Sequence, residues 1–189
     1  MENNYKQGCK LKHLRINIYG GPGCGKSTVA SSVFSYLKSK DYSIEMVPEY
    51  VKFWAYMDRK IESFDQLYLL AKQIYKEDSL HRFGVQYTIT DCPILICVVY
   101  AKLYNFIAWE ELISICKKFE EIIPSINIFL ERPNILYKQN GRYETYDQAL
   151  IVDNEIKSVL NINCIKYTEI DYLVTDVAKY IENEINTIN

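Results

Sequence analysis

The stretch Gly20-Gly21-Pro22-Gly23-Cys24-Gly25-Lys26-Ser27 decides how the rest of this 189-residue sequence is interpreted. It matches the pattern GxxxxGK[ST], in which glycines let the backbone turn so that successive N–H groups face one anion. The β-rich segment 14–19 (LRINIY) precedes it, and the residues after it place Val29, Val33 and Leu37 on one helical face. A glycine loop between a strand and a helix predicts a phosphate-binding cradle.

The cradle predicts two ligands, ATP and Mg²⁺. Lys26 would supply positive charge to the β- and γ-phosphates, and Ser27 would place its hydroxyl on Mg²⁺. The alternative is a glycine turn that joins strand to helix without any ligand. The residues expected to hold the nucleotide here are Gly20, Gly21, Pro22, Gly23, Cys24, Gly25, Lys26, Ser27 and Thr28.

Strand-like and helical patterns alternate along the chain. Short β-rich segments occur at 14–19, 43–47, 85–90, 125–130 and 162–167. Helical spacing occurs at 28–39, at 64–83, after Pro93 through Tyr104, at 109–122 and at 149–160. In 64–83 the apolar positions are 64, 67, 71 and 74, and a last helical pattern consists of residues 173, 174, 177, 181 and 185. This alternation predicts an α/β fold, a five-stranded parallel sheet sandwiched by helices. Ligands should gather at the carboxyl ends of its strands.

Composition predicts one domain over residues 1–189, in which 49% of residues are hydrophobic and the net charge is −2. Residues 1–12 are expected to be loose, and the polar stretch 131–147 to form a short lid. No signal peptide or membrane span is apparent, because the longest apolar run covers only 93–101. A cytoplasmic location, without a membrane partner, is therefore expected.

Cysteine and histidine usage argues against a metal-binding scaffold. No CxxC pair occurs, and His13 and His81 have no evident triad or metal companion, so both are expected to be structural. A zinc site and a disulfide framework are therefore not expected, which fits a reducing compartment. The cysteines are at positions 9, 24, 92, 97, 116 and 164.

Two carboxylates follow predicted strands, at the rim where the cradle lies. Glu49 would accept the proton of an attacking hydroxyl or orient a metal-bound water; alternatively it complements the dipole of a helix start. Asp91 would hold Mg²⁺ through water, or bind Ser27 or a substrate group; alternatively it caps the helix after Pro93.

Basic residues in the predicted lid are candidates for closing over phosphates. Arg132, Lys138 and Arg142 would neutralise charge on the transferred group, with Arg142 favoured because it follows the turn Asn140-Gly141. The alternative is a solvated loop with scattered charge. Arg59 and Lys60 are weaker candidates for the same role.

Four residues are candidates for the pocket of a second substrate: Tyr50, Trp54, Gln73 and Tyr100. Aromatic rings stack on bases, and an amide can pair with a base edge. The alternative for each is an ordinary place in the hydrophobic core.

Together, GGPGCGKS, the strand-ending PEY at 48–50, TD at 90–91 and NGRYET at 140–145 resemble the P-loop nucleoside and nucleotide kinases. They resemble the small AAA-type kinase domains of phages and bacteria, a broad type to which the nicotinamide-riboside kinase domain belongs. The spacing from Glu49 to Trp54 also resembles the EPVxxW segment of deoxynucleoside kinases, whose glutamate is the general base. Two features differ: Asp91-Cys92-Pro93 replaces an arginine-bearing motif, and Pro48 precedes Glu49.

The resemblance implies a P-loop NTPase fold and magnesium-dependent transfer of the γ-phosphate from ATP. The second substrate would be a nucleoside or nucleotide, or a modified DNA base, since related phage kinases act on hydroxymethylated bases in DNA. Lys26, Glu49, Asp91 and Arg142 would be catalytic, and Arg132 and Lys138 would contact the nucleotide. A homodimer is possible. Two alternatives stay open, an NTPase that acts on a protein or nucleic-acid partner and a non-catalytic nucleotide-binding module.

Overall fold

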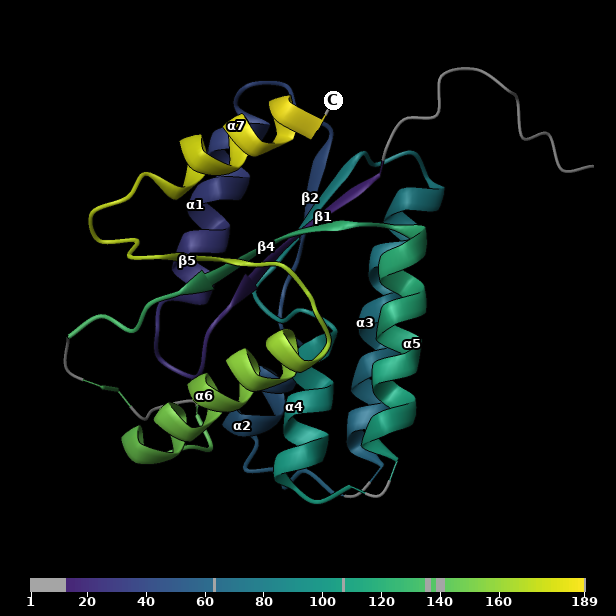
Figure 1. Cartoon of the computed structure of the whole chain (residues 1–189), viewed down its shortest axis with the longest axis vertical. Helices are drawn as coiled ribbons and strands as arrows, with labels where there is room; N and C mark the ends of the chain where they lie inside the picture. The colour runs from purple at the N-terminus through teal and green to yellow at the C-terminus, as the bar shows by residue number, and fades with distance from the viewer. Residues whose placement is uncertain (1–12, 63, 107, 135–136, 139–141, 189) are drawn as a thin grey trace, which may run out of the picture.

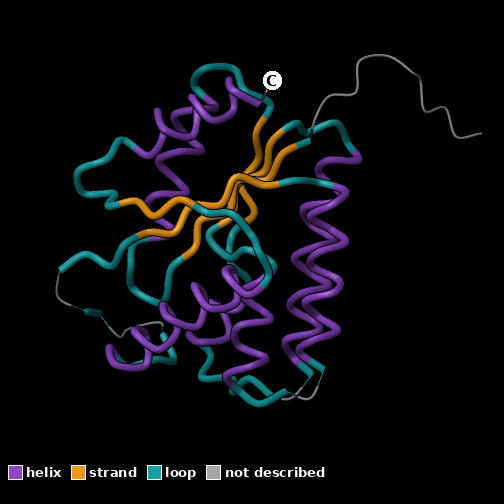
Figure 2. The backbone as a smooth tube through the Cα atoms, in the orientation of Figure 1, coloured by secondary structure: helices purple, strands orange, loops and turns teal. Residues whose placement is uncertain are grey.

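Five parallel strands form one sheet in the order β2-β3-β1-β4-β5 (Figures 1 and 2). The structure is a computed structural model that describes residues 13–62, 64–106, 108–134, 137–138 and 142–188. All six residues of the central strand β1 are buried, as expected for a strand covered on both faces. The strands are β1 (Leu14–Tyr19), β2 (Ile44–Val47), β3 (Tyr87–Thr90), β4 (Ser125–Leu130) and β5 (Thr168–Ile170).

Helices cover both faces of the sheet, which confirms the predicted fold class (Figure 1). On one face, α1 (Lys26–Lys38) and α7 (Val177–Ile188) pack against the strands through an aliphatic cluster. The other face carries a second cluster and the remaining larger helices. These are α3 (Asp65–Arg82), α4 (Leu95–Leu103), α5 (Trp109–Ile122) and α6 (Tyr146–Ile162), with the short α2 (Val51–Tyr56) beside them. The sequence patterns did not predict α2.

The predicted fifth strand at 162–167 is wrong. Helix α6 continues to Ile162 and ends in a Schellman motif, in which Cys164 adopts φ 55° and the Ile165 N–H donates to the Leu160 carbonyl at 3.0 Å. This helix ending occupies residues that otherwise look β-prone. Pairing with β4 therefore begins only at Thr168.

Two helical faces also differ from their predictions. In α3 the predicted apolar face is largely wrong, because Phe64 and Leu67 are exposed, whereas the buried side includes Gln73 and Glu77. The last helix begins at Val177, after a turn that leaves the side chains of residues 173 and 174 exposed. Apolar spacing alone does not report buried polar side chains.

The predicted lid, 131–147, has no regular element among its described residues until α6 begins at Tyr146. Thr145 starts that helix with a capping box, exchanging hydrogen bonds with Gln148. The segment 1–12 and the turn Asn140-Gly141 lie outside the described residues. Within the described part of the chain, no helix is long and apolar enough to cross a membrane.

Candidate active site

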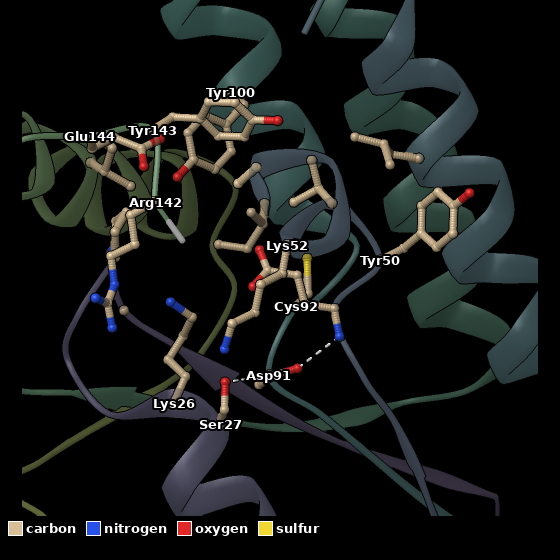
Figure 3. A pocket seen from close by; sticks show the side chains of 18 of the residues that line it. Lys26, Ser27, Tyr50, Lys52, Asp91, Cys92, Tyr100, Arg142, Tyr143 and Glu144 are labelled. Carbon is tan, nitrogen blue, oxygen red and sulfur yellow. Dashed lines mark hydrogen bonds between the residues drawn. The ribbon is translucent and has the colours of Figure 1, made fainter. Parts of the chain in front are cut away.

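Residues that follow β1, β2 and β3 line one pocket, together with the loop before α6 (Figure 3). The cradle contributes Gly20, Lys26 and Ser27, while Glu49 and Asp91 come from the ends of the next two strands of the sheet. Parallel strands bring their carboxyl ends to one edge, so residues far apart in sequence meet there. The pocket therefore lies at the carboxyl ends of the strands, where the sequence predicts that ligands bind.

Packing fixes the backbone of the glycine loop from outside. A Cβ added at Gly23 would lie 2.6 Å from the Tyr137 ring, and one at Gly25 would lie 2.5 Å from the Tyr172 hydroxyl. Both glycines also have positive φ values, 82° and 95°, which side chains rarely tolerate. The loop can therefore keep its amides turned toward an anion only with glycine at these positions.

Lys26 folds back over the loop and donates to the Gly21 carbonyl at 3.0 Å. Burial disfavours its charged form, but the nearby Cys24 and the carboxylates of Glu49 and Asp91 outweigh burial, so the pKa of Lys26 is raised. The ammonium stays charged, and it can transfer from a carbonyl oxygen to a phosphate oxygen at little cost.

A hydrogen-bond network joins the cradle to the neighbouring strand ends. The Ser27 hydroxyl donates to one carboxylate oxygen of Asp91 at 2.5 Å, and the Glu49 backbone N–H donates to the other at 3.0 Å. Asp91 does not cap the following helix, because α4 begins after Ile94 without a side-chain cap. One buried carboxylate therefore positions both the cradle serine and the backbone of Glu49.

The oxygen donors of this site fit Mg²⁺. Ser27 and Asp91 supply a hydroxyl and a carboxylate, the hard ligands that Mg²⁺ takes together with phosphate oxygens and water. The glycine loop, whose backbone conformation at Gly23 and Gly25 leaves no room for a side chain, fits the phosphates of ATP. Among the described residues, no cluster of three or more His, Cys, Asp or Glu side chains is arranged to hold a metal by itself.

Glu49 is half-buried in the pocket wall. Burial raises the pKa of its carboxyl, Lys26 opposes this rise, and the nearby Asp91 adds to it. A carboxylate with a raised pKa is a stronger base than an exposed one, and this property suits proton abstraction from a hydroxyl.

The predicted lid residues divide into two groups. Arg142 lines the pocket, where Figure 3 shows it on the same side as Lys26. Lys138 is exposed, does not line the pocket, and contacts Arg142 through its backbone carbonyl. Arg132 also lies outside the pocket lining, because its guanidinium donates to the Pro22 carbonyl at 2.8 Å and to Asp153 at 2.6 Å.

The candidates for a second substrate's pocket also divide. Tyr50, Gln73 and Tyr100 line the pocket. Trp54 is buried in the core, and the Arg59 guanidinium lies over its ring at 3.4 Å, so both are placed by packing. Lys60 is exposed and does not line the pocket.

Sequence reasoning missed three polar residues at the site. Asp153, from α6, accepts from the Gly21 N–H at 2.5 Å and so holds the cradle together with Arg132. Lys52 and Glu144 line the pocket (Figure 3), both act electrostatically on Glu49, and Glu144 also acts on Tyr100. Glu144 lies in the quoted NGRYET segment and Lys52 is three residues after Glu49, but nothing in the local sequence around Asp153 points to the cradle.

The profile of a family described as an AAA domain matches residues 15–178 of this chain. The chain belongs to this AAA domain family. No curated protein matches it. Its fold is similar to that of NadR, solved in complex with NAD and AMP-PNP, with a TM-score of 0.67 and 14% identity over 93% of this chain. The chain spans 49% of the NadR chain, about half its length.

Two smaller kinases share the fold of this AAA domain over nearly their whole lengths. Thymidylate kinase from Ehrlichia chaffeensis has a TM-score of 0.56 and 14% identity, over 93% of this chain and 98% of its own. Deoxyadenosine kinase from M. mycoides, solved with dATP, has a TM-score of 0.53 and 16% identity, over 92% and 100%. At these identities the similarity shows the P-loop kinase fold, and the activity has to be inferred from the residues of the site.

Proposed function

We propose that this protein is an ATP-dependent kinase that transfers the γ-phosphate to a hydroxyl or phosphate of a nucleoside or nucleotide. The observation that carries the proposal is the network of Ser27, Asp91 and the Glu49 backbone beside the Lys26 ammonium. These residues line one pocket, which supports their joint use as a phosphate cradle, a pair of metal-compatible oxygens and a base.

Each residue has a distinct task in this reaction. The cradle amides and Lys26 hold the β- and γ-phosphates, and Arg142 neutralises charge on the transferred group. Ser27 and Asp91 would hold Mg²⁺, which supplies further charge neutralisation when bound. The second substrate's oxygen forms a bond to the γ-phosphorus, the bond from that phosphorus to the bridging oxygen breaks, and ADP leaves. When that oxygen is a hydroxyl, its proton passes to the Glu49 carboxylate.

The pocket beyond the phosphates supports a nucleoside-like second substrate. Tyr50 and Tyr100 offer aromatic surface, and Gln73 offers a polar group among apolar neighbours. The thymidylate and deoxyadenosine kinases that share the fold are named for substrates of this class. A hydroxymethylated base in DNA offers a hydroxyl to the same chemistry and is included in the test below.

ADP release measured with and without second substrates tests the proposal. We expect slow release with ATP alone, and acceleration by at least one nucleoside, nucleotide or hydroxymethylated DNA, with labelled phosphate on that compound. Fast hydrolysis that no such compound accelerates would instead identify an NTPase. If calorimetry detects no binding of magnesium-ATP or magnesium-GTP to the folded protein, the phosphate cradle does not bind a nucleoside triphosphate and the proposal fails.

A further inference from the structure

The buried side of α3 is polar where it meets the pocket. Gln73, which is 5% exposed, lines the pocket, and one turn later Glu77 is fully buried. Polar side chains on a buried helical face cost free energy unless they are hydrogen-bonded, so their partners show what they do.

Both hydrogens of the Gln73 amide are already used. Its nitrogen donates to the Glu77 carboxylate at 2.6 Å and to the Thr90 hydroxyl at 3.1 Å. Since an amide nitrogen has two hydrogens, no donor remains for a ligand. Among the described residues, no group donates a hydrogen bond to the Gln73 oxygen.

The buried partners prevent the amide from turning over. Rotation by 180° would bring the Gln73 oxygen against a Glu77 carboxylate oxygen, and two acceptors repel at this distance. Glu77 is held by Arg15 at 3.5 Å, and Arg15 in turn donates to the Ile123 carbonyl at 2.9 Å and pairs with Glu120. Burial raises the pKa of Glu77, and the Arg15 guanidinium opposes that rise by favouring the carboxylate.

We propose that Gln73, locked by Glu77 and Arg15, presents only a hydrogen-bond acceptor to the pocket and selects second substrates that direct an N–H group at it. Nucleosides and nucleotides with an exocyclic amino group, such as adenine or cytosine derivatives, belong to this class. A substrate with a carbonyl oxygen at the same place is rejected, because two acceptors face each other without a hydrogen. This inference rests on the proposed kinase function and specifies its second substrate.

Matched pairs that differ only in the amino group test the selection. The pairs are adenosine with purine riboside and cytidine with its 4-deamino analogue, each as ribo- and deoxynucleoside and as 5′-monophosphate. Binding is measured by calorimetry in the presence of magnesium and a non-hydrolysable ATP analogue, and turnover is measured separately by ADP release. We expect at least one amino compound to bind about ten- to a hundred-fold more tightly than its partner.

Three variants assign the selection to this side chain. Gln73→Met keeps the length of the side chain and removes the oxygen, and should bring the affinity ratio close to one. Glu77→Gln lets the Gln73 amide adopt either orientation, and should lower the ratio while leaving an amide in place. Gln66→Met is the matched control, because Gln66 is buried on the same helix and lines the same pocket. It should keep the ratio.

The outcomes separate this inference from the proposed function. Equal affinity within every pair, no binding of any pair, or an unchanged ratio in Gln73→Met overturns the assignment of Gln73. So does loss of the ratio in Gln66→Met alone. Selective binding without phosphate transfer supports Gln73 and contradicts the kinase function. Transfer to both members of a pair with equal kcat/KM supports the kinase function and contradicts Gln73.

Discussion

The hydrogen bond between Ser27 and Asp91 offers the sharpest test of the site. In Asp91→Asn, the amide oxygen can still accept from the Glu49 N–H, which leaves the amide nitrogen facing the Ser27 hydroxyl. Ser27 must then accept a hydrogen where it now donates one. A lone pair that should face Mg²⁺ becomes occupied, and the negative charge beside the metal position disappears.

The size of the effect follows from the geometry. A 2.5 Å hydrogen bond from a hydroxyl to a carboxylate is charge-assisted, and bonds of this kind contribute about 1.5–3 kcal/mol. The bond is already present before the nucleotide binds, so the affinity is lost through the charged group that the variant removes beside the metal. An interaction of the same charge-assisted kind there corresponds to roughly ten- to a hundred-fold in affinity for magnesium-ATP. Affinity for ATP without magnesium should change little, because the cradle amides and Lys26 are untouched.

Calorimetry on Asp91→Asn, Ser27→Ala and the double variant, with and without magnesium, measures this effect. If the two residues act as one unit, the binding free energy lost in the double variant is smaller than the sum of the losses in the two single variants. We expect this difference, the coupling energy, to be about 1–2 kcal/mol. Losses that add, or equal losses in the absence of magnesium, would refute the role assigned to the network. A normal thermal melt of each variant controls for folding.

Three further perturbations test separate parts of the structure. Lys26→Ala should reduce phosphate transfer at least about 100-fold with an unchanged melting profile, and normal turnover would remove the cradle as the ATP site. Glu49→Gln should lower kcat about 100-fold at nearly constant ATP affinity. Because burial raises the pKa of Glu49, the wild-type rate should rise with pH above the usual carboxyl range, and the variant should lose that rise. Burial lowers the pKa of His81 from 6.5 to about 4, so the unfolded chain binds more protons between these values and stability falls as pH drops. The free energy of unfolding should fall by about 3 kcal/mol between pH 6.5 and pH 4, at about 1.4 kcal/mol per pH unit. Urea titrations at these two pH values measure the fall, and His81→Gln should remove it. An unchanged pH dependence in the variant would contradict this account.

The fold was predictable where local sequence and tertiary contacts agree. Each of the first four strands is a short β-rich segment beside a turn or a glycine loop, and the motif 20–27 specifies the loop between β1 and α1. The fifth strand could not be placed, because the register of β5 depends on how α6 ends at Cys164. A helix ending of this kind is set by backbone geometry and leaves little trace in the apolar pattern.

The candidate site likewise contains residues that the local sequence identifies and residues that only the tertiary packing brings there. Lys26, Ser27 and Asp91 could be assigned roles because a contiguous motif or a strand end identifies them. Asp153 could not, since it reaches Gly21 from a helix 132 residues later in the chain. Arg132 was expected at the phosphates and instead holds the outside of the cradle with Asp153, a contact that only the packing of α6 against the loop creates.

The polar interior behind the pocket is costly for stability alone. Burying Arg15 and Glu77 removes two charges from water, and well-packed apolar residues of similar size would serve stability equally well or better. Even with the pair formed, an oxygen of Glu77 and a nitrogen of Arg15 lack a hydrogen-bond partner among the described residues. Arg15 also joins β1 to the end of α5, through the Ile123 carbonyl and Glu120, and Glu77 fixes the direction of one amide, Gln73, at the pocket wall. We therefore attribute part of this cost to the proposed selection of a second substrate. The buried face of α3, which the apolar pattern misassigned, would carry that selectivity.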